Sequence, residues 1–268
     1  MWTDEELNEL NREIYRRKSV RSYKSEELPV GVKERILDAA KNKAVPLNQC
    51  ACVFKLLNEA DVEKPFGGAP HFLATYTEQG MANEDEALNA AFLMQEMSLY
   101  LSDAGIGSCW LGMAKAKKDF MEITEEGKKM QFCKMMAIGY GSQEIYRDNL
   151  NQFNRKAISA ISNLKGLDSL LEAAGLAPSA VNQQAWFWSG EPSEMSAGMP
   201  KRLRLFSGNA NILMNSFLKP LQTLDSGIAL AHLWIAANKE KKFKGFLDEN
   251  GVKPPKKGLR YIKTLQLM

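Results

Sequence analysis

The feature that most constrains the fold of this chain is a pattern that occurs in it twice. Residues 36–54 (ILDAAKNKAVPLNQCACVF) align with residues 170–188 (LLEAAGLAPSAVNQQAWFW). The identities include Ala39-Ala40 with Ala173-Ala174 and Asn48-Gln49 with Asn182-Gln183. Self-similarity at a fixed separation is the signature of a repeated structural unit.

A second, shorter match follows the first in the same order. LSDAGIG at residues 101–107 resembles LDSGIAL at residues 224–230. Because the order is the same in both halves, we interpret the chain as two diverged copies of a helix–loop–strand–central helix unit. The expected domains are residues 1–160 and 161–268.

Length and composition exclude several classes of protein. A chain of 268 residues that is 45% hydrophobic and 25% charged is long enough for one large domain or two fused ones. The net charge of +3 argues against a dedicated nucleic-acid binder. The chain has no run of about 18 apolar residues, and MWTDEELNEL does not resemble a signal peptide. We therefore expect a cytoplasmic protein without membrane or nucleic-acid partners.

Cysteine and histidine are too few and too scattered for the common metal and nucleophile sites. The residues are Cys50, Cys52, Cys109, Cys133, His71 and His232. Their spacings fit neither a zinc site nor a C-x-x-C redox motif, and neither histidine accompanies a G-x-S-x-G elbow. We predict structural residues, reduced thiols and no metal site.

Hydrophobic periodicity predicts an α+β protein. The expected helices are 4–17, 30–41, 84–103, 166–175 and 222–238, and the expected strands are 51–57, 71–77, 108–113, 131–139, 187–190 and 258–267. Thr3 with Glu6 forms a capping box, and Asn83 is the expected N-cap of the 84–103 helix. This helix and the 222–238 helix are apolar on most sides, which is typical of central helices.

The basic stretch YRRKSVRSY, residues 15–23, has two interpretations. Cations in the last turn of a helix interact favourably with its dipole, by about 0.3–1 kcal/mol. Alternatively, Arg17, Lys18, Ser19 and Arg21 supply the donors of a phosphate site. Arginine and lysine are denser here than a helix end requires.

Three further stretches also have two interpretations each. AGIGSCWLG (104–112) is either a helix cap with a tight turn or a close backbone approach to a planar ligand. APSAVNQQAW (177–186) is either a capped turn or a set of amide groups facing the edge of a heterocycle. NRKAIS (154–159) is a solvated loop or a second basic cluster.

Taken together and in this order, these stretches resemble the nitroreductase family of FMN-dependent oxidoreductases. The matching segments are RKSVR (17–21), GIGSCW (105–110), IGYG (138–141), RK (155–156) and APSAVNQQAW (177–186). The resemblance covers most of residues 10–240. It implies a nitroreductase-like α+β fold, with a mixed or antiparallel sheet flanked by helices.

The chain departs from the family pattern in the position of one motif. The A-P-S-A-x-N segment usually follows the basic motif by about twenty residues, but KAVPLNQCACV (43–53) occupies that place. The intact version occurs only in the second copy, where Gln184-Ala185-Trp186 replaces Gln-Pro-Trp. Family members bind FMN between two subunits, so we hypothesise a fused pseudo-dimer with one composite FMN site. The chain would then be a monomeric pseudo-dimer or a homodimer.

The resemblance also implies roles for individual residues. The cofactor-binding set is Arg17, Lys18, Ser19, Arg21, Leu111, Gly112, Arg155, Lys156, Pro178, Ser179, Asn182 and Gln184. Arg17, Lys18 and Ser19 would hold the phosphate, helped by Arg155 or Lys156. Arg21 would stabilise the reduced flavin electrostatically, and no side chain is expected to act as a catalytic nucleophile.

The function implied by the resemblance is NAD(P)H oxidation. FMN would take a hydride at N5 and pass electrons in a ping-pong cycle to a nitroaromatic, a quinone or another small acceptor. One alternative is a related flavin activity, such as reductive dehalogenation, with residues 189–211 as a lid. Another is a degenerate flavin-binding or structural protein without turnover.

Overall fold

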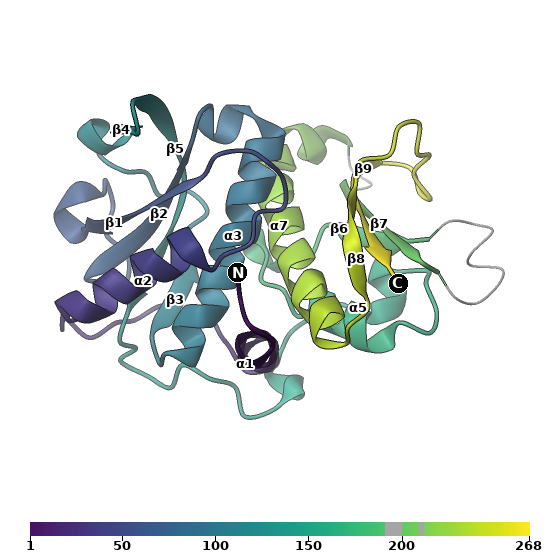
Figure 1. Cartoon of the computed structure of the whole chain (residues 1–268), viewed down its shortest axis with the longest axis horizontal. Coiled ribbons are helices and arrows are strands. Elements are labelled where there is room, and N and C mark those ends of the chain that lie inside the picture. The colour runs from purple at the N-terminus through teal and green to yellow at the C-terminus, as the bar shows by residue number, and fades with distance from the viewer. Residues whose placement is uncertain (191–199, 209–211) are drawn as a thin grey trace. The chain divides into compact units, whose positions relative to one another are not determined.

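The computed structural model describes residues 1–190, 200–208 and 212–268, and the chain forms two compact units (Figure 1). Unit 1 spans Met1–Gln152 and unit 2 spans Phe153–Met268. The boundary expected from the sequence lies a short way further along the chain, between residues 160 and 161.

Unit 1 consists of one antiparallel sheet and three helices. The elements are α1 (Asp4–Ile14), α2 (Val30–Asn42), β1 (Val53–Asn58), β2 (His71–Thr77), α3 (Glu84–Asp103), β3 (Gly107–Trp110), β4 (Glu122–Glu125) and β5 (Lys128–Gly139). The strand order is β1-β2-β5-β3, and β4 forms a hairpin with β5. Helix α3 packs against β2, β3 and β5, and α2 packs against β1.

Helix α3 has the bounds that the sequence predicts. Asn83 Oδ1 accepts hydrogen bonds from the backbone N–H groups of Asp85 and Glu86, at 3.0 and 3.2 Å, which fixes the start of the helix. Almost every side chain along α3 is buried, so the helix is central in its unit. The predicted capping box of Thr3 and Glu6 begins α1.

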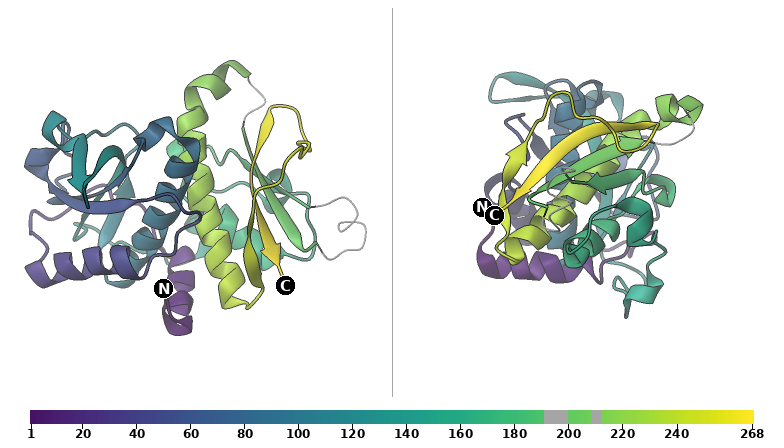
Figure 2. Two further views of the ribbon diagram at one scale, coloured as in Figure 1. Left: turned by 45° about the horizontal axis from the view of Figure 1, so that its top comes forward. Right: turned by 90° about the vertical axis from the view of Figure 1, so that its right-hand side faces the viewer.

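Unit 2 contains a second antiparallel sheet with its own long helix. The elements are α4 (Ile158–Ile161), α5 (Asp168–Gly175), β6 (Trp186–Ser189), β7 (Arg202–Gly208), α7 (Ile212–Lys239), β8 (Phe243–Leu247) and β9 (Leu259–Leu267). The strand order is β6-β7-β9-β8. Helix α7 packs against the strands and against α5, and Figure 2 follows it alongside the twisted sheet.

The two units have the same topology. The strand order β1-β2-β5-β3 of unit 1 corresponds to β6-β7-β9-β8 of unit 2. In the chain, the long helix follows the second strand of each unit: α3 lies between β2 and β3, and α7 lies between β7 and β8. The bulge between the second and last strands also matches. It follows Thr75, the partner of Phe54, in unit 1, and Leu205, the partner of Trp188, in unit 2. Phe54 and Trp188 are aligned positions in the two sequence copies.

The α+β prediction and the antiparallel sheets flanked by helices are confirmed, while several details differ. The match of residues 101–107 with 224–230 is wrong, because the first stretch spans the end of α3 and a turn whereas the second lies inside α7. Helix α1 ends at Ile14 rather than residue 17, because Arg17 pairs in extended conformation with Tyr146. The predicted 108–113 strand ends at Trp110. The sequence did not predict β4, β7 and β8. Strand β7 lies within residues 189–211, the stretch suggested as a lid, and residues 191–199 and 209–211 of that stretch lie outside the described residues.

Candidate functional site

The basic segment of unit 1 is an extended strand-like stretch that three other segments hold in place. The N–H of Val20 donates to the carbonyl oxygen of Ser108 at 3.0 Å, and the N–H of Tyr23 donates to that of Gly67 at 2.9 Å. Lys24 N–H donates to Tyr140 O at 2.9 Å. The predicted motifs around residues 17–21, 105–110 and 138–141 therefore come together in one place.

Two glycines allow this close approach. A Cβ on Gly67 would lie 2.3 Å from the carbonyl oxygen of Arg21, and Gly67 has a φ of +60°. A Cβ on Gly107 would lie 2.7 Å from Cγ2 of Val20. The sequence suggested that Gly107 could admit a planar ligand, whereas here its missing side chain makes room for the basic segment itself.

A fourth segment, residues 144–147, runs alongside the start of the basic segment and adds Arg147 to its arginines. Arg147 N–H donates to Arg16 O at 2.7 Å, and Arg147 Nη1 donates to the carbonyl oxygen of Arg17. Arg17 and Tyr146 form an antiparallel bridge. Arg147 belongs to none of the sequence motifs. Its place beside Arg16 and Arg17 follows only from the pairing of the two segments in the fold.

The charges of these arginines act on common neighbours. Burial, and then the charge of Arg21, lower the pKa of Arg147. Burial raises the pKa of the Cys109 thiol, while Arg21, Arg17 and a hydrogen bond with Ser19 lower it. The charges of Arg17 and Arg21 therefore both act on Cys109, and the charge of Arg21 also acts on Arg147. Such a group of like charges is stabilised by an anion.

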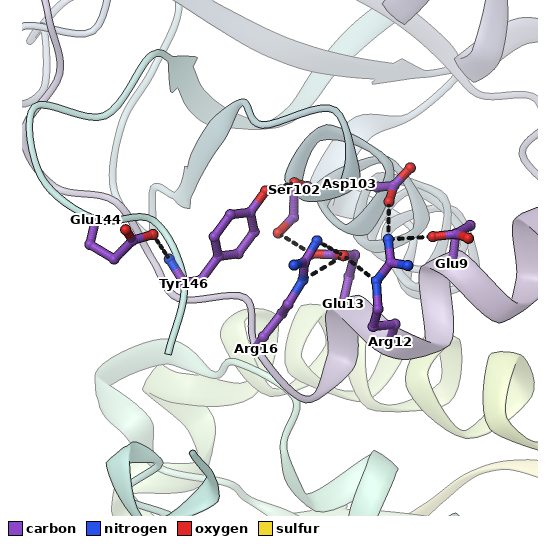
Figure 3. Close-up of polar contacts among 8 residues, drawn as sticks. All are labelled: Glu9, Arg12, Glu13, Arg16, Ser102, Asp103, Glu144 and Tyr146. Atoms are coloured by element: carbon purple, nitrogen blue, oxygen red, sulfur yellow. Dashed lines mark hydrogen bonds and ion pairs between the residues drawn. The ribbon is translucent and has the colours of Figure 1, made fainter. Parts of the chain in front are cut away.

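A network of buried polar groups fixes the point where α1 ends and the basic segment begins (Figure 3). The fully buried carboxylate of Glu13 accepts hydrogen bonds from Ser102 Oγ at 2.7 Å and Arg16 Nε at 2.8 Å. The guanidinium of Arg16 lies 4.1 Å above the ring of Tyr146, whose hydroxyl donates to Ser102 O at 2.7 Å. Arg12 pairs with Glu9 and Asp103. Arg12 and Arg16 are thus paired with acidic residues.

The remaining predicted residues of unit 1 differ in exposure. Lys18 and Ser19 are half-buried, and Arg21 is exposed. Leu111 is buried and Gly112 is exposed, with open space where a Cβ would stand. The carbonyl oxygen of Gly112 accepts a hydrogen bond from Lys134 Nζ at 2.5 Å, and burial lowers the pKa of this lysine.

In unit 2, the structure brings together the other two predicted stretches. Arg155 Nη1 donates to Asn182 Oδ1 at 2.8 Å, and Asn182 Nδ2 donates to Asn154 O at 2.8 Å. Lys156 Nζ donates to the carbonyl oxygens of Gln183 and Gln184 at 2.8 and 3.2 Å. The polar side chains of the APSAVNQQAW loop therefore bind the Asn154–Lys156 segment.

The same loop also makes hydrogen bonds within itself. Ser179 Oγ accepts from the N–H of Gln184 at 2.9 Å, and Gln184 Nε2 donates to Asn182 O at 3.2 Å. Gln184 Oε1 also accepts from the N–H of Lys156 at 2.8 Å, outside the loop. Pro178, Ser179 and Asn182 are half-buried, and Gln184 is buried. The stretch is a hydrogen-bonded turn, as the first interpretation expects. The half-buried side chains of Ser179 and Asn182 also leave polar groups accessible to a ligand, as the second expects.

Over the part of the chain that the structure describes, no cluster of three or more metal-ligating side chains occurs. No described helix is long and apolar enough to cross a membrane. Both histidines are buried and hydrogen-bonded, His71 to Leu28 N–H and His232 to Ala173 O.

Comparisons with known proteins agree with the resemblance seen in the sequence. A family model described as "Putative TM nitroreductase" matches residues 9–237. A solved structure titled "putative nitroreductase (tm1586)" from Thermotoga maritima MSB8 has a TM-score of 0.63 and 18% identity, covering 96% of this chain and 93% of its own. No curated protein matches the chain.

Two other solved structures match about half of the chain. A nitroreductase with bound FMN from Desulfitobacterium hafniense DCB-2 has a TM-score of 0.40 and 15% identity, covering 54% of this chain and 92% of its own. A "Putative NADH dehydrogenase/NAD(P)H nitroreductase" from Bacteroides thetaiotaomicron VPI-5482 has a TM-score of 0.36 and 18% identity, covering 50% and 88%.

Proposed function

Because the chain belongs to the nitroreductase-like family that this model describes and has the corresponding fold, we propose that it is an FMN-dependent NAD(P)H oxidoreductase. Its electron acceptor would be a nitroaromatic, a quinone or another small molecule. The arginine group of unit 1, defined as Arg17, Arg21 and Arg147, is the observation that carries this proposal.

The donors of unit 1 suit the phosphate of FMN. Guanidinium groups bind phosphate oxygens through paired N–H donors, and the Ser19 hydroxyl and Lys18 ammonium add further donors. Arg12 and Arg16, which precede these donors, pair with carboxylates.

Within this proposal, each residue of unit 1 has a role. The chemistry that FMN supplies when bound is hydride acceptance from NAD(P)H and delivery of electrons to a second substrate, in alternating half-reactions. Arg17, Lys18, Ser19 and Arg147 would hold the phosphate, and Arg21 would stabilise negative charge on the ring system. The backbone of Leu111 and Gly112 would lie against the ring.

For unit 2, we propose that Pro178, Ser179, Asn182 and Gln184 also contribute to flavin binding. Arg155 and Lys156 would then act by holding the shape of this loop, given their hydrogen bonds to it. The hypothesis of one composite site per chain comes from the sequence resemblance, and the flavin stoichiometry tests it.

We also propose that the two halves are diverged copies that act as a pseudo-dimer. The aligned sequences, the common strand order and the bulge at matching positions support the duplication. Two sheets of separate origin would not be expected to have a bulge at the same aligned residues, whereas two copies of one sheet would.

The test is the FMN content of the purified protein. Visible absorbance, followed by release and quantification of FMN, is expected to give about one FMN per chain, and the loaded protein should oxidise NADH or NADPH. Two per chain would mean that each unit holds its own site. No flavin, even after incubation with excess FMN, would overturn the proposal.

The second candidate is a degenerate flavin-binding or structural protein without turnover. The observation that favours it is the internal hydrogen bonding of Asn182, whose amide binds Arg155 and Asn154. FMN binding without NAD(P)H oxidation, across a series of small acceptors, would support this candidate.

A further inference from the structure

Asp225 is a buried carboxyl on helix α7 that makes contact with the APSAVNQQAW loop. It is 4% exposed, and its Oδ1 accepts a hydrogen bond of 2.9 Å from the N–H of Ala180. Its Oδ2 is buried and has no hydrogen-bond partner in the described part of the chain. Burying a carboxyl with one unsatisfied oxygen costs free energy of folding, so such groups are rare unless they have a role.

The loop that Asp225 contacts has an unfavourable backbone. Val181, Asn182 and Gln184 have φ values of +47°, +55° and +47°. Asparagine tolerates this region, but a β-branched valine is rarely found there. Such a conformation persists only where surrounding contacts determine it. The hydrogen bond from Ala180 to Asp225 is one of these contacts and ties the loop to the central helix of its unit.

Unit 1 contains a similar contact. Glu96 on α3 is fully buried, and its Oε2 accepts hydrogen bonds from Val45 N–H at 3.1 Å and Trp2 Nε1 at 2.5 Å. Its Oε1 has no partner among the described residues. The sequence alignment places Val45 opposite Ser179, next to Ala180. In both units, therefore, a buried carboxyl of the central helix accepts an N–H from the loop before the first strand.

The surroundings of Asp225 favour its neutral form. Burial raises its pKa to about 7, and the hydrogen bond from Ala180 N–H opposes that shift. The charged side chains on the elements packed against α7 are Asp168 and Glu172 of α5, Arg202 and Arg204 of β7, Lys244 of β8, and Arg260 and Lys263 of β9. None of them forms an ion pair or hydrogen bond with Asp225 in the structure as described.

We propose that Asp225 is a positioning residue: its neutral form holds the Ser179–Gln184 loop in the observed conformation, and its ionisation loosens the loop. If the loop contributes to FMN binding, as the proposed function states, FMN affinity falls as Asp225 ionises. This consequence rests on the proposed function. A carboxyl that is neutral in the bound conformation and ionised in a loosened one couples affinity to pH. The affinity falls by up to about tenfold per pH unit between the pKa of the loosened conformation and the higher pKa of the bound one, and levels off above the higher pKa.

The first test follows the loop itself and does not depend on flavin. Hydrogen exchange of the peptide covering residues 177–186 is measured at pH 5 and pH 7.5 in the full-length protein and in Asp225→Asn. Asparagine keeps an acceptor for Ala180 N–H but cannot ionise. Comparing the variants at one pH removes the intrinsic pH dependence of exchange. We expect faster exchange in the wild type than in Asp225→Asn at pH 7.5, and a smaller difference at pH 5.

The second test measures the FMN dissociation constant over the same pH range. Relative to Asp225→Asn, the wild type should bind at least about tenfold more weakly at pH 7.5 than at pH 5, whereas Asp225→Ala should bind weakly at both pH values. Glu96→Gln is the matched control, because it changes the similar carboxyl of unit 1 and leaves the loop of unit 2 unaltered.

The outcomes separate this inference from the proposed function. Parallel pH profiles for the wild type and Asp225→Asn, in exchange and in FMN binding, would overturn the positioning role while leaving the proposed function intact. Absence of FMN binding in every variant would overturn the proposed function, and the exchange measurement would still decide whether Asp225 controls the loop.

Discussion

The hydroxyl of Ser102, at the end of α3, donates a hydrogen bond of 2.7 Å to the buried carboxylate of Glu13 in α1. The same carboxylate accepts from Arg16, which precedes Arg17 at the start of the basic segment (Figure 3). The position of the arginine group therefore depends on an acidic residue outside every motif in the sequence.

Glu13→Ala should destabilise unit 1 and weaken FMN binding. The substitution leaves Ser102 and Arg16 without their buried acceptor, which costs about 2–3 kcal/mol. Urea unfolding at pH 7 measures this change. Glu9→Ala is the control, because its pair with Arg12 is exposed and contributes about 0–1 kcal/mol. Equal effects of the two substitutions would contradict the role given to Glu13.

Gly67→Ala should displace the basic segment. The new Cβ would lie 2.3 Å from the carbonyl oxygen of Arg21, so the backbone that carries Arg21 must move. The purified variant should contain less FMN than the wild type. Gly127→Ala is the control, since Gly127 has a comparable φ of +78° but open space around its Cβ position. It should lose about 1 kcal/mol of stability and keep its flavin. Normal flavin content in Gly67→Ala would count against the contact.

Arg147→Ala and Arg21→Ala should each raise the FMN dissociation constant by about 10–100-fold, because a hydrogen bond to a charged group contributes about 1.5–3 kcal/mol. Titration followed by flavin fluorescence measures the effect, which should shrink at high salt. Arg21→Ala should also slow reduction of the flavin by NAD(P)H. Arg12→Ala removes a guanidinium that is paired with acids and should bind FMN normally. Unchanged affinity in Arg147→Ala would remove this residue from the site.

The stability of unit 1 should fall as the pH rises from about 5 to 8, because of Glu96. Burial raises the pKa of Glu96 to about 8, against opposing hydrogen bonds from Trp2 and Val45. The folded state then holds a proton that the unfolded state has lost. The free energy of unfolding therefore decreases with pH between the unfolded and folded pKa values, by at most about 1.4 kcal/mol per pH unit. Glu96→Gln should lack this slope in urea unfolding at pH 5, 6.5 and 8. The same slope in both proteins would assign it to other groups.

The central helices could be predicted from sequence because their signals are local. Asn83 and the acidic residues that follow it define the start of α3, and the apolar residues define its length. The start of α7 was missed, since Pro220 favours a helix boundary although the helix continues through it. Strand β7 was also missed, because its Arg204 is stabilised by a distant partner, Glu249, to which it donates at 2.6 Å.

The candidate site could be predicted only in part, for a similar reason. Arg17, Ser19 and Arg21 belong to a recognisable motif, whereas Arg147 joins them through pairing of the 144–147 segment with the end of α1. Asp225 contacts Ala180 of this loop in the structure, but the two residues are 45 positions apart in the sequence. Pairings between distant segments depend on the whole fold and leave no periodic signal in the chain.

The matching topology of the two units changes what a mutation can do in this protein. In a homodimer, every substitution is present in both subunits. A residue that improves one copy of a site must therefore also be tolerated at the equivalent position of the other subunit. Two copies within one chain are free of that restriction. Under the proposed duplication, the segment leading into β1 would have lost the serine and tryptophan that the segment leading into β6 keeps, while both sheets kept the same pairing and the same bulge. One copy would then specialise while the other keeps the family's residues.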